Sequence, residues 1–278
     1  MAIVDKALWV IERNSEQALT LPSIAAACGV SRSHLANAFG TASGWPVMKY
    51  LKARRLSEAA RRLAAGAPDI LAVALEAGYG SHEAFTRAFR DQFGRTPEEV
   101  RRQAGLDDLA LVMPLELRSG RVRAPRPALR DMGRRLLVGL SAPCSFRETI
   151  NIPAQWQRFM ADHCCDIPRR VQKMPIGICT APDEEGGFRY VCAAEVEAFE
   201  DRRAALTYLE IEPGSYAVFE HNDHVSTIFD TYTAIWNDAL PALARRVADG
   251  PVLEFHNDGF DPETGLGGLQ ICIPLEKR

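Results

Sequence analysis

The sequence has no long apolar run, no cysteine pair with C-x-x-C spacing and no recognisable catalytic set. No stretch approaches the roughly 18 uncharged apolar residues of a membrane helix, and acidic residues interrupt the apolar pattern of the N-terminal MAIVDKALWVIERN, unlike a signal peptide. We therefore expect a cytoplasmic protein without a membrane partner. The seven cysteines are scattered and lack C-x-x-C spacing, which favours reduced, buried thiols over a metal site, and we expect no cofactor.

The length and the charge distribution indicate two domains with different tasks. The chain has 278 residues, of which 47% are apolar and 25% are charged. Residues 1–105 hold 14 lysines and arginines against 10 acidic residues, whereas residues 136–278 hold 12 against 22. A basic module suits an anionic partner, and the acidic module suits another function.

The first third of the chain is predicted to be entirely helical and internally repeated. IAAACGVSRSHLANAFGTASGWP aligns with VALEAGYGSHEAFTRAFRDQFGRTP, offset by 49 residues before the turn and by 50 after it. In each copy a short helix ends at a glycine, and a Ser begins a second helix with an apolar i, i+4 pair. Each copy is therefore predicted to be a helix-turn-helix, and residues 46–65 are predicted to connect them as one long helix.

The face opposite each apolar pair is predicted to read DNA bases in the major groove. In the first copy this face carries Arg32, Ser33, Ala36 and Asn37. In the second copy it carries His82, Glu83, Thr86, Arg87 and Arg90. Candidates for phosphate contacts flank both helices: Lys49, Lys52, Arg54, Arg61, Arg62, Arg95, Arg101 and Arg102. A solvated helix face is the alternative for either helix alone, but the repeat favours base reading.

Residues 5–103 resemble the tandem helix-turn-helix domain of the AraC/XylS family of transcription regulators. The resemblance rests on IAAACGVSRSHLANAF, the FTRAF at 85–89, and the glycines and prolines that end each unit. It implies double-stranded DNA as a partner, and RNA polymerase as a further one. Where members commonly carry Arg in the first reader, this chain has Asn37, so we expect the second reader, with Arg87, to contribute more affinity.

The remaining sequence changes its period and is predicted to form an α+β domain. Seven apolar or alternating segments read as strands, among them FRYVCAAEV, SYAVFEH and LQICIPL, and LELRSGRV at 115–122 reads as a first extended piece. Helical patterns interrupt them at residues 153–165 and 225–247. The order repeats strand, helix, strand, strand, which predicts two similar halves around a cleft.

This second segment resembles the GyrI-like small-molecule-binding domain. The resemblance rests on FRYVCAAEVE, IEPGSYAVFEH, YTAIW and GPVLEFHNDGFDPETG. It implies a cleft for flat, hydrophobic and often cationic compounds, with aromatic faces and a carboxylate as its recognition groups. The candidate effector-binding residues are Trp156, Tyr190, Trp236, Glu254 and Gln270. Gln270 stands where cation-binding members carry Glu, so Glu254 or Glu220 would have to supply the charge.

Together these patterns predict a DNA-binding transcription regulator that senses a small molecule. The expected organisation is a DNA-binding domain at residues 1–108, a linker at 109–117 and a GyrI-like domain at 118–278. Two alternatives remain open: a GyrI-like hydrolase with Glu254 as general base, and a protein that sequesters its compound. No Ser/His/Asp arrangement supports the hydrolase, so we predict that the chain is not an enzyme.

Overall fold

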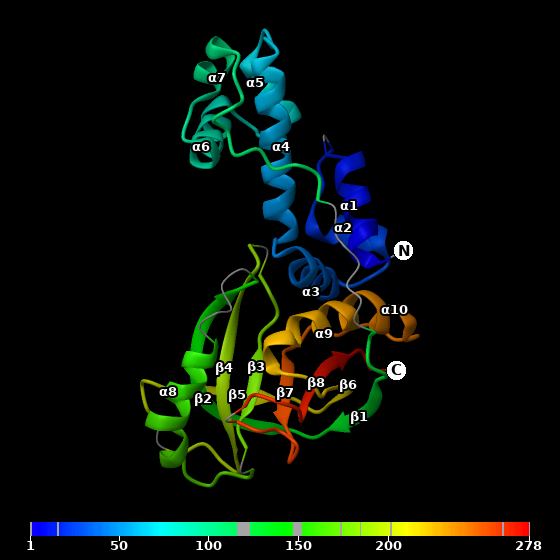
Figure 1. Cartoon of the computed structure of the whole chain (residues 1–278), viewed down its shortest axis with the longest axis vertical. Helices are drawn as coiled ribbons and strands as arrows, with labels where there is room; N and C mark the ends of the chain where they lie inside the picture. The colour runs from blue at the N-terminus through cyan, green and yellow to red at the C-terminus, as the bar shows by residue number, and fades with distance from the viewer. Residues whose placement is uncertain are drawn as a thin grey trace.

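The computed structural model describes residues 2–15, 17–115, 123–146, 152–172, 174–183, 185–200, 202–262 and 264–277. Its N-terminal part is helical and its C-terminal part is α+β, as predicted, and the strands of the C-terminal part form one sheet (Figure 1). The predicted extended segment at 115–122 lies almost wholly outside the described residues. No described helix is both long and apolar enough to cross a membrane.

Seven helices make up the N-terminal part and confirm the repeat. They are α1 (Ile3–Arg13), α2 (Leu21–Cys28), α3 (Arg32–Ser43), α4 (Val47–Ala64), α5 (Ile70–Glu76), α6 (His82–Phe93) and α7 (Pro97–Gln103). The turns before α3 and α6 repeat in backbone conformation, since Gly29 and Gly78 have φ values of 77° and 83°. Such left-handed conformations cost glycine little. The side chains of Ser31 and Ser81 then cap α3 and α6.

Helix α4 is the rigid connector between the two helix-turn-helix units. Its 18 residues span about 27 Å at 1.5 Å per residue. Its apolar stripe is buried along its length, with Tyr50 and Leu51 on the first unit and Leu56 and Leu63 on the second. Figure 1 shows α1–α3 next to the C-terminal part, whereas α5–α7 stand away from it at the far end of α4.

The C-terminal part is a single antiparallel sheet with helices on it. The strands are β1 (Ala128–Met132), β2 (Arg135–Ser145), β3 (Ile176–Cys179), β4 (Gly187–Val196), β5 (Thr207–Ile211), β6 (Gly214–His221), β7 (Val252–His256) and β8 (Leu269–Leu275). The helices are α8 (Ile152–Asp162), α9 (Ile228–Ala234) and α10 (Leu240–Ala242), with the π-helical segment η3 (Ile235–Ala239) between the last two. Short 3-10 turns, η1 (Cys164–Asp166) and η2 (Val225–Thr227), complete it.

The strand order shows that the two predicted halves share one sheet. The strand order is β1-β6-β8-β7-β3-β4-β2-β5, with β3 and β7 paired at the centre. Counted outward from the centre, β3-β4-β2-β5 in one half corresponds to β7-β8-β6-β1 in the other. Register places Cys192, Gly177, Glu254 and Ile271 side by side across four strands, and side chains opposite one another share a face. Both α8 and α9 cover this face, so the junction of the halves lies between them.

Candidate nucleic-acid interface and effector site

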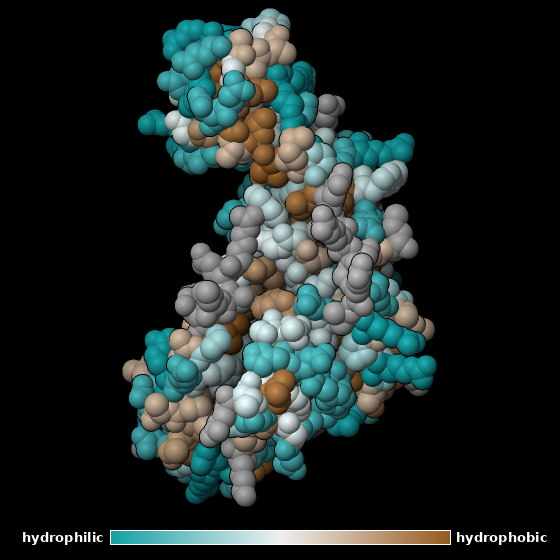
Figure 2. All heavy atoms as spheres, in the orientation of Figure 1, coloured by the Kyte–Doolittle hydropathy of each residue, from teal (hydrophilic) through white to brown (hydrophobic). Residues whose placement is uncertain are grey.

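Helix α6 presents its predicted reading face to solvent. Phe85, Phe89 and Phe93 are at most 9% exposed, and their rings follow one another at 5.5 and 4.7 Å. They hold one side of α6 in the core of α4–α7. The opposite side carries the exposed Glu83, Arg87 and Arg90 and the half-buried His82 and Thr86. Hydrophilic side chains dominate the surface of this part of the molecule in the view of Figure 2.

The polar groups on this face differ in availability. His82 Nε2 lies 2.9 Å from Glu98 Oε1, and the Thr86 hydroxyl oxygen is buried without a partner among the described residues. Thr86 therefore presents mainly apolar atoms, which suit a thymine methyl. Arg87 and Arg90 form no ion pair with the described part of the chain, so their guanidinium groups are available to a polyanion.

Helix α3 is covered where the sequence predicted an open face. Ser33 and Ala36 are each 8% exposed, Asn37 is half-buried, and only Arg32 of the predicted set is exposed. A Cβ atom placed on Gly40, on the same face, would lie 2.2 Å from the Phe146 ring of the C-terminal part. The expectation that this face is open to solvent is wrong for this arrangement. DNA contact by these residues stays a prediction.

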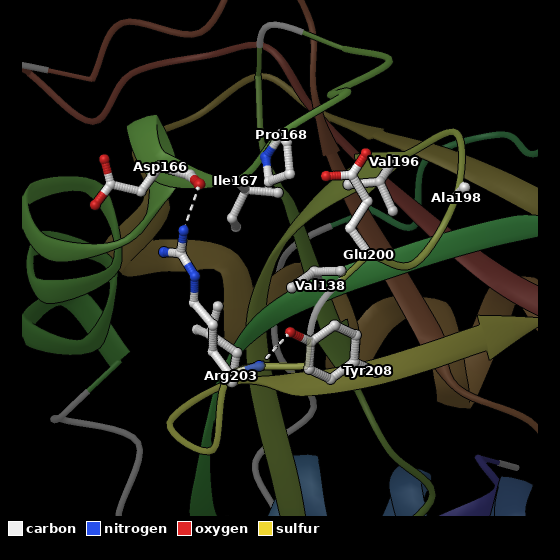
Figure 3. Close-up of a pocket in the computed structure, with 10 residues that line it drawn as sticks. Val138, Asp166, Ile167, Pro168, Val196, Ala198, Glu200, Arg203 and Tyr208 are labelled. Carbon is white, nitrogen blue, oxygen red and sulfur yellow. Dashed lines mark hydrogen bonds between the residues drawn. The ribbon is translucent and has the colours of Figure 1, made fainter.

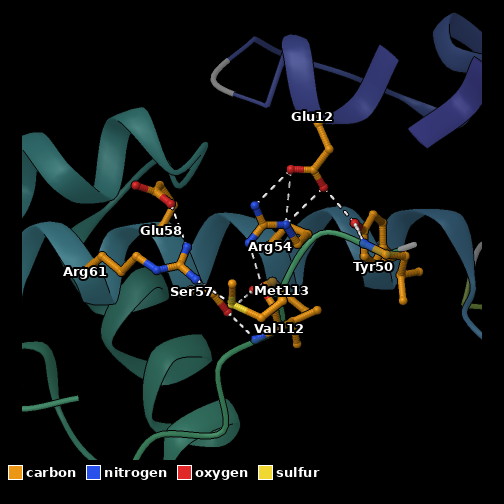
Figure 4. Close-up of polar contacts among 10 residues, drawn as sticks. Glu12, Tyr50, Arg54, Ser57, Glu58, Arg61, Val112 and Met113 are labelled. Atoms are coloured by element: carbon orange, nitrogen blue, oxygen red, sulfur yellow. Dashed lines mark hydrogen bonds and ion pairs between the residues drawn. The ribbon is translucent and has the colours of Figure 1, made fainter. Parts of the chain in front are cut away.

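Arg54 of α4 forms hydrogen bonds within the fold instead of extending into solvent. Arg54, predicted as a phosphate contact, donates to Glu12 Oε2 at 2.8 Å and to the Val112 carbonyl at 2.7 Å (Figure 4). The Tyr50 hydroxyl also donates to Glu12 at 2.6 Å. Because Arg54 is 8% exposed, it cannot contact a phosphate without leaving this network. This predicted phosphate contact is therefore wrong in the described arrangement.

The predicted linker is ordered where it is described, because it runs along α4. Val112 N–H donates to the Ser57 hydroxyl at 2.9 Å, and Leu115 N–H donates to the Tyr50 hydroxyl at 3.1 Å. Arg61 and Arg62 are engaged nearby by Glu58 and Glu76. The phosphate candidates that remain exposed are Lys49, Lys52, Arg101 and Arg102.

The junction of the two sheet halves contains a buried carboxylate between two tyrosines. Glu254 is 5% exposed, and it accepts hydrogen bonds from Tyr190 and Tyr232, each at 2.6 Å. The Cys179 thiol lies 3.9 Å from the same carboxylate, and Trp156 Nε1 donates to the Tyr190 hydroxyl at 3.1 Å. Three predicted effector residues, Trp156, Tyr190 and Glu254, are thus brought together.

A glycine makes room for this cluster. A Cβ atom on Gly177 would lie 2.4 Å from the Tyr190 hydroxyl and 2.7 Å from Glu254 Oε2. Burial, and then the charge of Glu254, raise the pKa values of Tyr190 and Tyr232 well above the ordinary value. The same two causes raise the pKa of the Cys179 thiol. All three groups are therefore neutral hydrogen-bond donors rather than activated nucleophiles.

Two predicted effector residues lie elsewhere. Trp236 is 1% exposed and packs beneath α3, with its ring centroid 5.3 Å from that of His34. Gln270 is opposite Phe255 in the strand register and so lies on the other face of the sheet from Glu254, where it donates to Glu220 at 2.8 Å. Tyr232 takes the place expected for Trp236, one helical turn earlier. Tyr232 lies in the same YTAIW segment as Trp236, but the helical period alone could not show which of the two aromatic residues faces Glu254.

Comparison with known proteins agrees with both parts of this architecture. A model described as a helix-turn-helix domain matches residues 24–103, and one described as an integron-associated effector binding protein matches residues 136–275. The right origin-binding protein of Escherichia coli is 34% identical over 99% of this chain and 98% of its own length. The transcriptional regulator Rob of Salmonella typhimurium is 27% identical over the same shares. The regulatory protein SoxS of Escherichia coli is 34% identical over 36% of this chain and 92% of its own.

The chain belongs to the AraC family and is Rob-like along its whole length. It is a DNA-binding transcription regulator with a GyrI-like effector-binding domain. The SoxS match covers about a third of the chain, whereas the Rob-like matches cover nearly all of it and so include the sheet. Its homologues are transcription regulators, which argues for a regulator rather than an enzyme.

The Rob-like regulator also has a small, open hollow at the β2–β5 edge of its sheet (Figure 3). Arg203 donates there to the Asp166 carbonyl at 3.2 Å and, through its main chain, to the Tyr208 hydroxyl at 2.8 Å. Glu200 is paired with Arg169. These polar groups satisfy one another, and the residues that line the hollow include none of the Glu254 cluster. Among the described residues, no group of three or more His, Cys, Asp or Glu side chains is placed to hold a metal.

Proposed function

We propose that this regulator reads DNA with α6 and α3 and responds to a hydrophobic monocation that binds at Glu254. The reading residues would be His82, Glu83, Thr86, Arg87 and Arg90 on α6, and Arg32, Ser33, Ala36 and Asn37 on α3. The exposed guanidinium groups of Arg87 and Arg90 support the assignment for α6, because Arg is the side chain that most often contacts guanine. The domain limits proposed are 1–108 and 118–278.

The observation that supports a cationic effector is the burial of the Glu254 carboxylate without an opposite charge beside it among the described residues. This carboxylate is 5% exposed, and no ion pair compensates it within the described ranges. Burying a carboxylate is costly unless hydrogen bonds or an opposite charge accompany it, and here two tyrosine hydroxyls supply only the first. A cation next to Glu254 would supply the second. The half-buried indole of Trp156 would provide the aromatic face that such a cation favours.

We further propose that the compound is bound and not turned over, and that RNA polymerase is a partner. Neutral Cys179, Tyr190 and Tyr232 support the first statement, because none is activated for attack. The naming of a full-length relative as a transcriptional regulator supports the second. Recovery of the bound compound unchanged after incubation tests the absence of turnover.

Two ions of the same shape and opposite charge test the effector class. Isothermal titration with tetraphenylphosphonium is expected to show binding to the full chain, and tetraphenylborate is expected to bind at least tenfold more weakly. Glu254→Gln keeps the size of the side chain and its ability to accept a tyrosine hydrogen bond but removes the charge. It should weaken tetraphenylphosphonium binding at least tenfold. Equal affinity for both ions, or an unchanged affinity in Glu254→Gln, would refute the proposal.

A further inference from the structure

The effector domain packs against the first reading helix, α3, and within the described part of the chain makes no such contact with the second, α6. Helix α3 packs on α9 and η3, and one continuous apolar core includes Leu35 and Phe39 of α3 together with Ile235 and Trp236. Figure 1 shows α3 lying directly on α9, with α6 at the other end of α4. A helix whose reading face is covered cannot enter a major groove.

A polar clasp lies inside this interface. Leu240 N–H bonds to the Ile235 carbonyl, five residues back, as in a π-helix. The fifth residue after Trp236 is Pro241, which has no N–H, so the Trp236 carbonyl lacks its usual helical donor. His34 Nε2 fills that position at 2.7 Å. Because a carbonyl only accepts, Nε2 carries the proton.

Two further contacts hold α1 and α3 against the C-terminal part, one from η3 and one from the end of β2. Asn237, next to Trp236, accepts the Val4 N–H of α1 at 3.3 Å through its side chain. Phe146 covers Gly40 of α3, where any larger residue would meet its ring. The interface is therefore made of specific bonds from both domains. Single-turn π-segments often mark functional positions in helices, and this one carries both hydrogen bonds to the N-terminal helices, at Trp236 and Asn237.

The same helical segment reaches the effector site. Tyr232, one turn before Trp236, donates to Glu254 at 2.6 Å and is 8% exposed. A ligand that occupies the Glu254 carboxylate must compete with this hydroxyl. Displacement of Tyr232 would move the start of η3, on which the Trp236 carbonyl and Asn237 are mounted. The ligand site and the clasp are therefore joined by a single turn of helix.

From this geometry we infer that the effector domain is an autoinhibitory clamp on α3, and that a ligand at Glu254 opens it through Tyr232. In the closed state only α6 reads DNA. In the open state both helices read, at sites one helical turn or roughly 34 Å apart. The clamp itself does not depend on the nature of the ligand, whereas its release by a cation rests on the proposed function.

A reversible lock tests the clamp without any ligand. The lock replaces Gly40 and Phe146 of the full chain by cysteines, because the Phe146 side chain lies directly over Gly40. Selection from random-sequence duplexes should return two half-sites with the reduced double variant and one with the oxidised form. Phe146→Cys alone, under the same oxidant, is the control, because Gly40→Cys alone would place its side chain against the Phe146 ring. Two half-sites bound equally well by the oxidised form would overturn the inference.

A second variant guards against misfolding of the locked protein. Phe146→Ala removes the ring over Gly40 and leaves every residue of α3, α6 and the Glu254 cluster unchanged. It should bind a two-half-site duplex at least tenfold more tightly than the unaltered chain, with a steeper dependence of affinity on salt because more phosphates are contacted. An unchanged affinity and salt slope would contradict the clamp.

The release step has its own measurement. Tetraphenylphosphonium should raise the affinity of the full chain for the two-half-site duplex, and Tyr232→Phe should reduce that increase at least fivefold. If the ion fails to bind in calorimetry, the proposed cationic effector is wrong and the lock experiment still decides the clamp. If the ion binds and DNA affinity does not rise, release through Tyr232 is wrong.

Discussion

Replacement of Arg54 by Met separates a structural arginine from a DNA-binding one. The guanidinium donates to both carboxylate oxygens of Glu12 and to the Val112 carbonyl, and it is 8% exposed. Met keeps the apolar stem but leaves Glu12 half-buried without its cation and Val112 without its donor. Breaking one partner of such a pair costs about 2–4 kcal/mol of unfolding free energy.

The assay is urea unfolding of the full chain, followed by helix content, with Glu12→Gln/Arg54→Met as the matched control. The double variant has no uncompensated carboxylate, so it should recover about 1 kcal/mol or more of the loss. Salt slopes on a duplex should match the unaltered chain, since Arg54 makes no phosphate contact. A stability change under about 0.5 kcal/mol, or a clear fall in the salt slope, would refute the structural assignment.

The pH dependence adds an independent check on the same residue. Burial raises the pKa of Glu12, but hydrogen bonds from Arg54 and Tyr50 outweigh it and hold the pKa below 4.5. Near pH 4 the unfolded chain therefore binds more protons, so the stabilisation by Glu12 is complete above pH 4.5 and is lost as pH falls through the lowered value. The difference between the unaltered chain and Arg54→Met should shrink in this acidic range. A difference that is constant with pH would show that Glu12 is not the group involved.

Three further predictions concern the reading helices, the effector site and the clasp. Arg87→Ala should weaken operator binding by about 1–3 kcal/mol and by more than Asn37→Ala, in quantitative footprinting at fixed salt; the opposite order would contradict the ranking of the readers. Gly177→Ala should weaken tetraphenylphosphonium binding in calorimetry at least tenfold, because its Cβ would displace the Tyr190 hydroxyl and Glu254; unchanged binding would place the ligand elsewhere. Burial lowers the pKa of His34 below 6.5, so the bond from neutral His34 to the Trp236 carbonyl is fully stabilising above pH 6.5 and weakens as the pH falls below that value. Amide protection of α3 should therefore fall towards pH 5.5 in the unaltered chain but not in His34→Gln. Equal protection profiles in the two proteins would exclude His34.

The sequence was sufficient for features that depend on neighbouring residues. The Gly29 and Gly78 turns and the Phe85, Phe89 seam follow from local conformational preferences, and the structure confirms them. Most strands of the sheet were predicted by alternation. β1 was not, because four of its five residues are exposed, so it carries no buried face to detect.

Features that depend on distant pairing could not be predicted. Gln270 and Glu254 fall on opposite faces because Glu254 pairs with Ile271, and nothing local to either strand sets that register.

The predicted reading face of α3 shows most clearly what local sequence could not predict. Small residues such as Ser33, Ala36 and Gly40 suit close approach by a DNA groove and equally by another protein surface. Phe146, which covers Gly40, and Trp236, which contacts the neighbouring His34, both lie more than 100 residues away in the sequence. Both uses require the same face, so a protein that covers it with its own effector domain can control access to DNA by competition. A ligand can therefore change DNA binding by weakening the contact between His34 of α3 and Trp236 of η3, without acting on either reading helix directly.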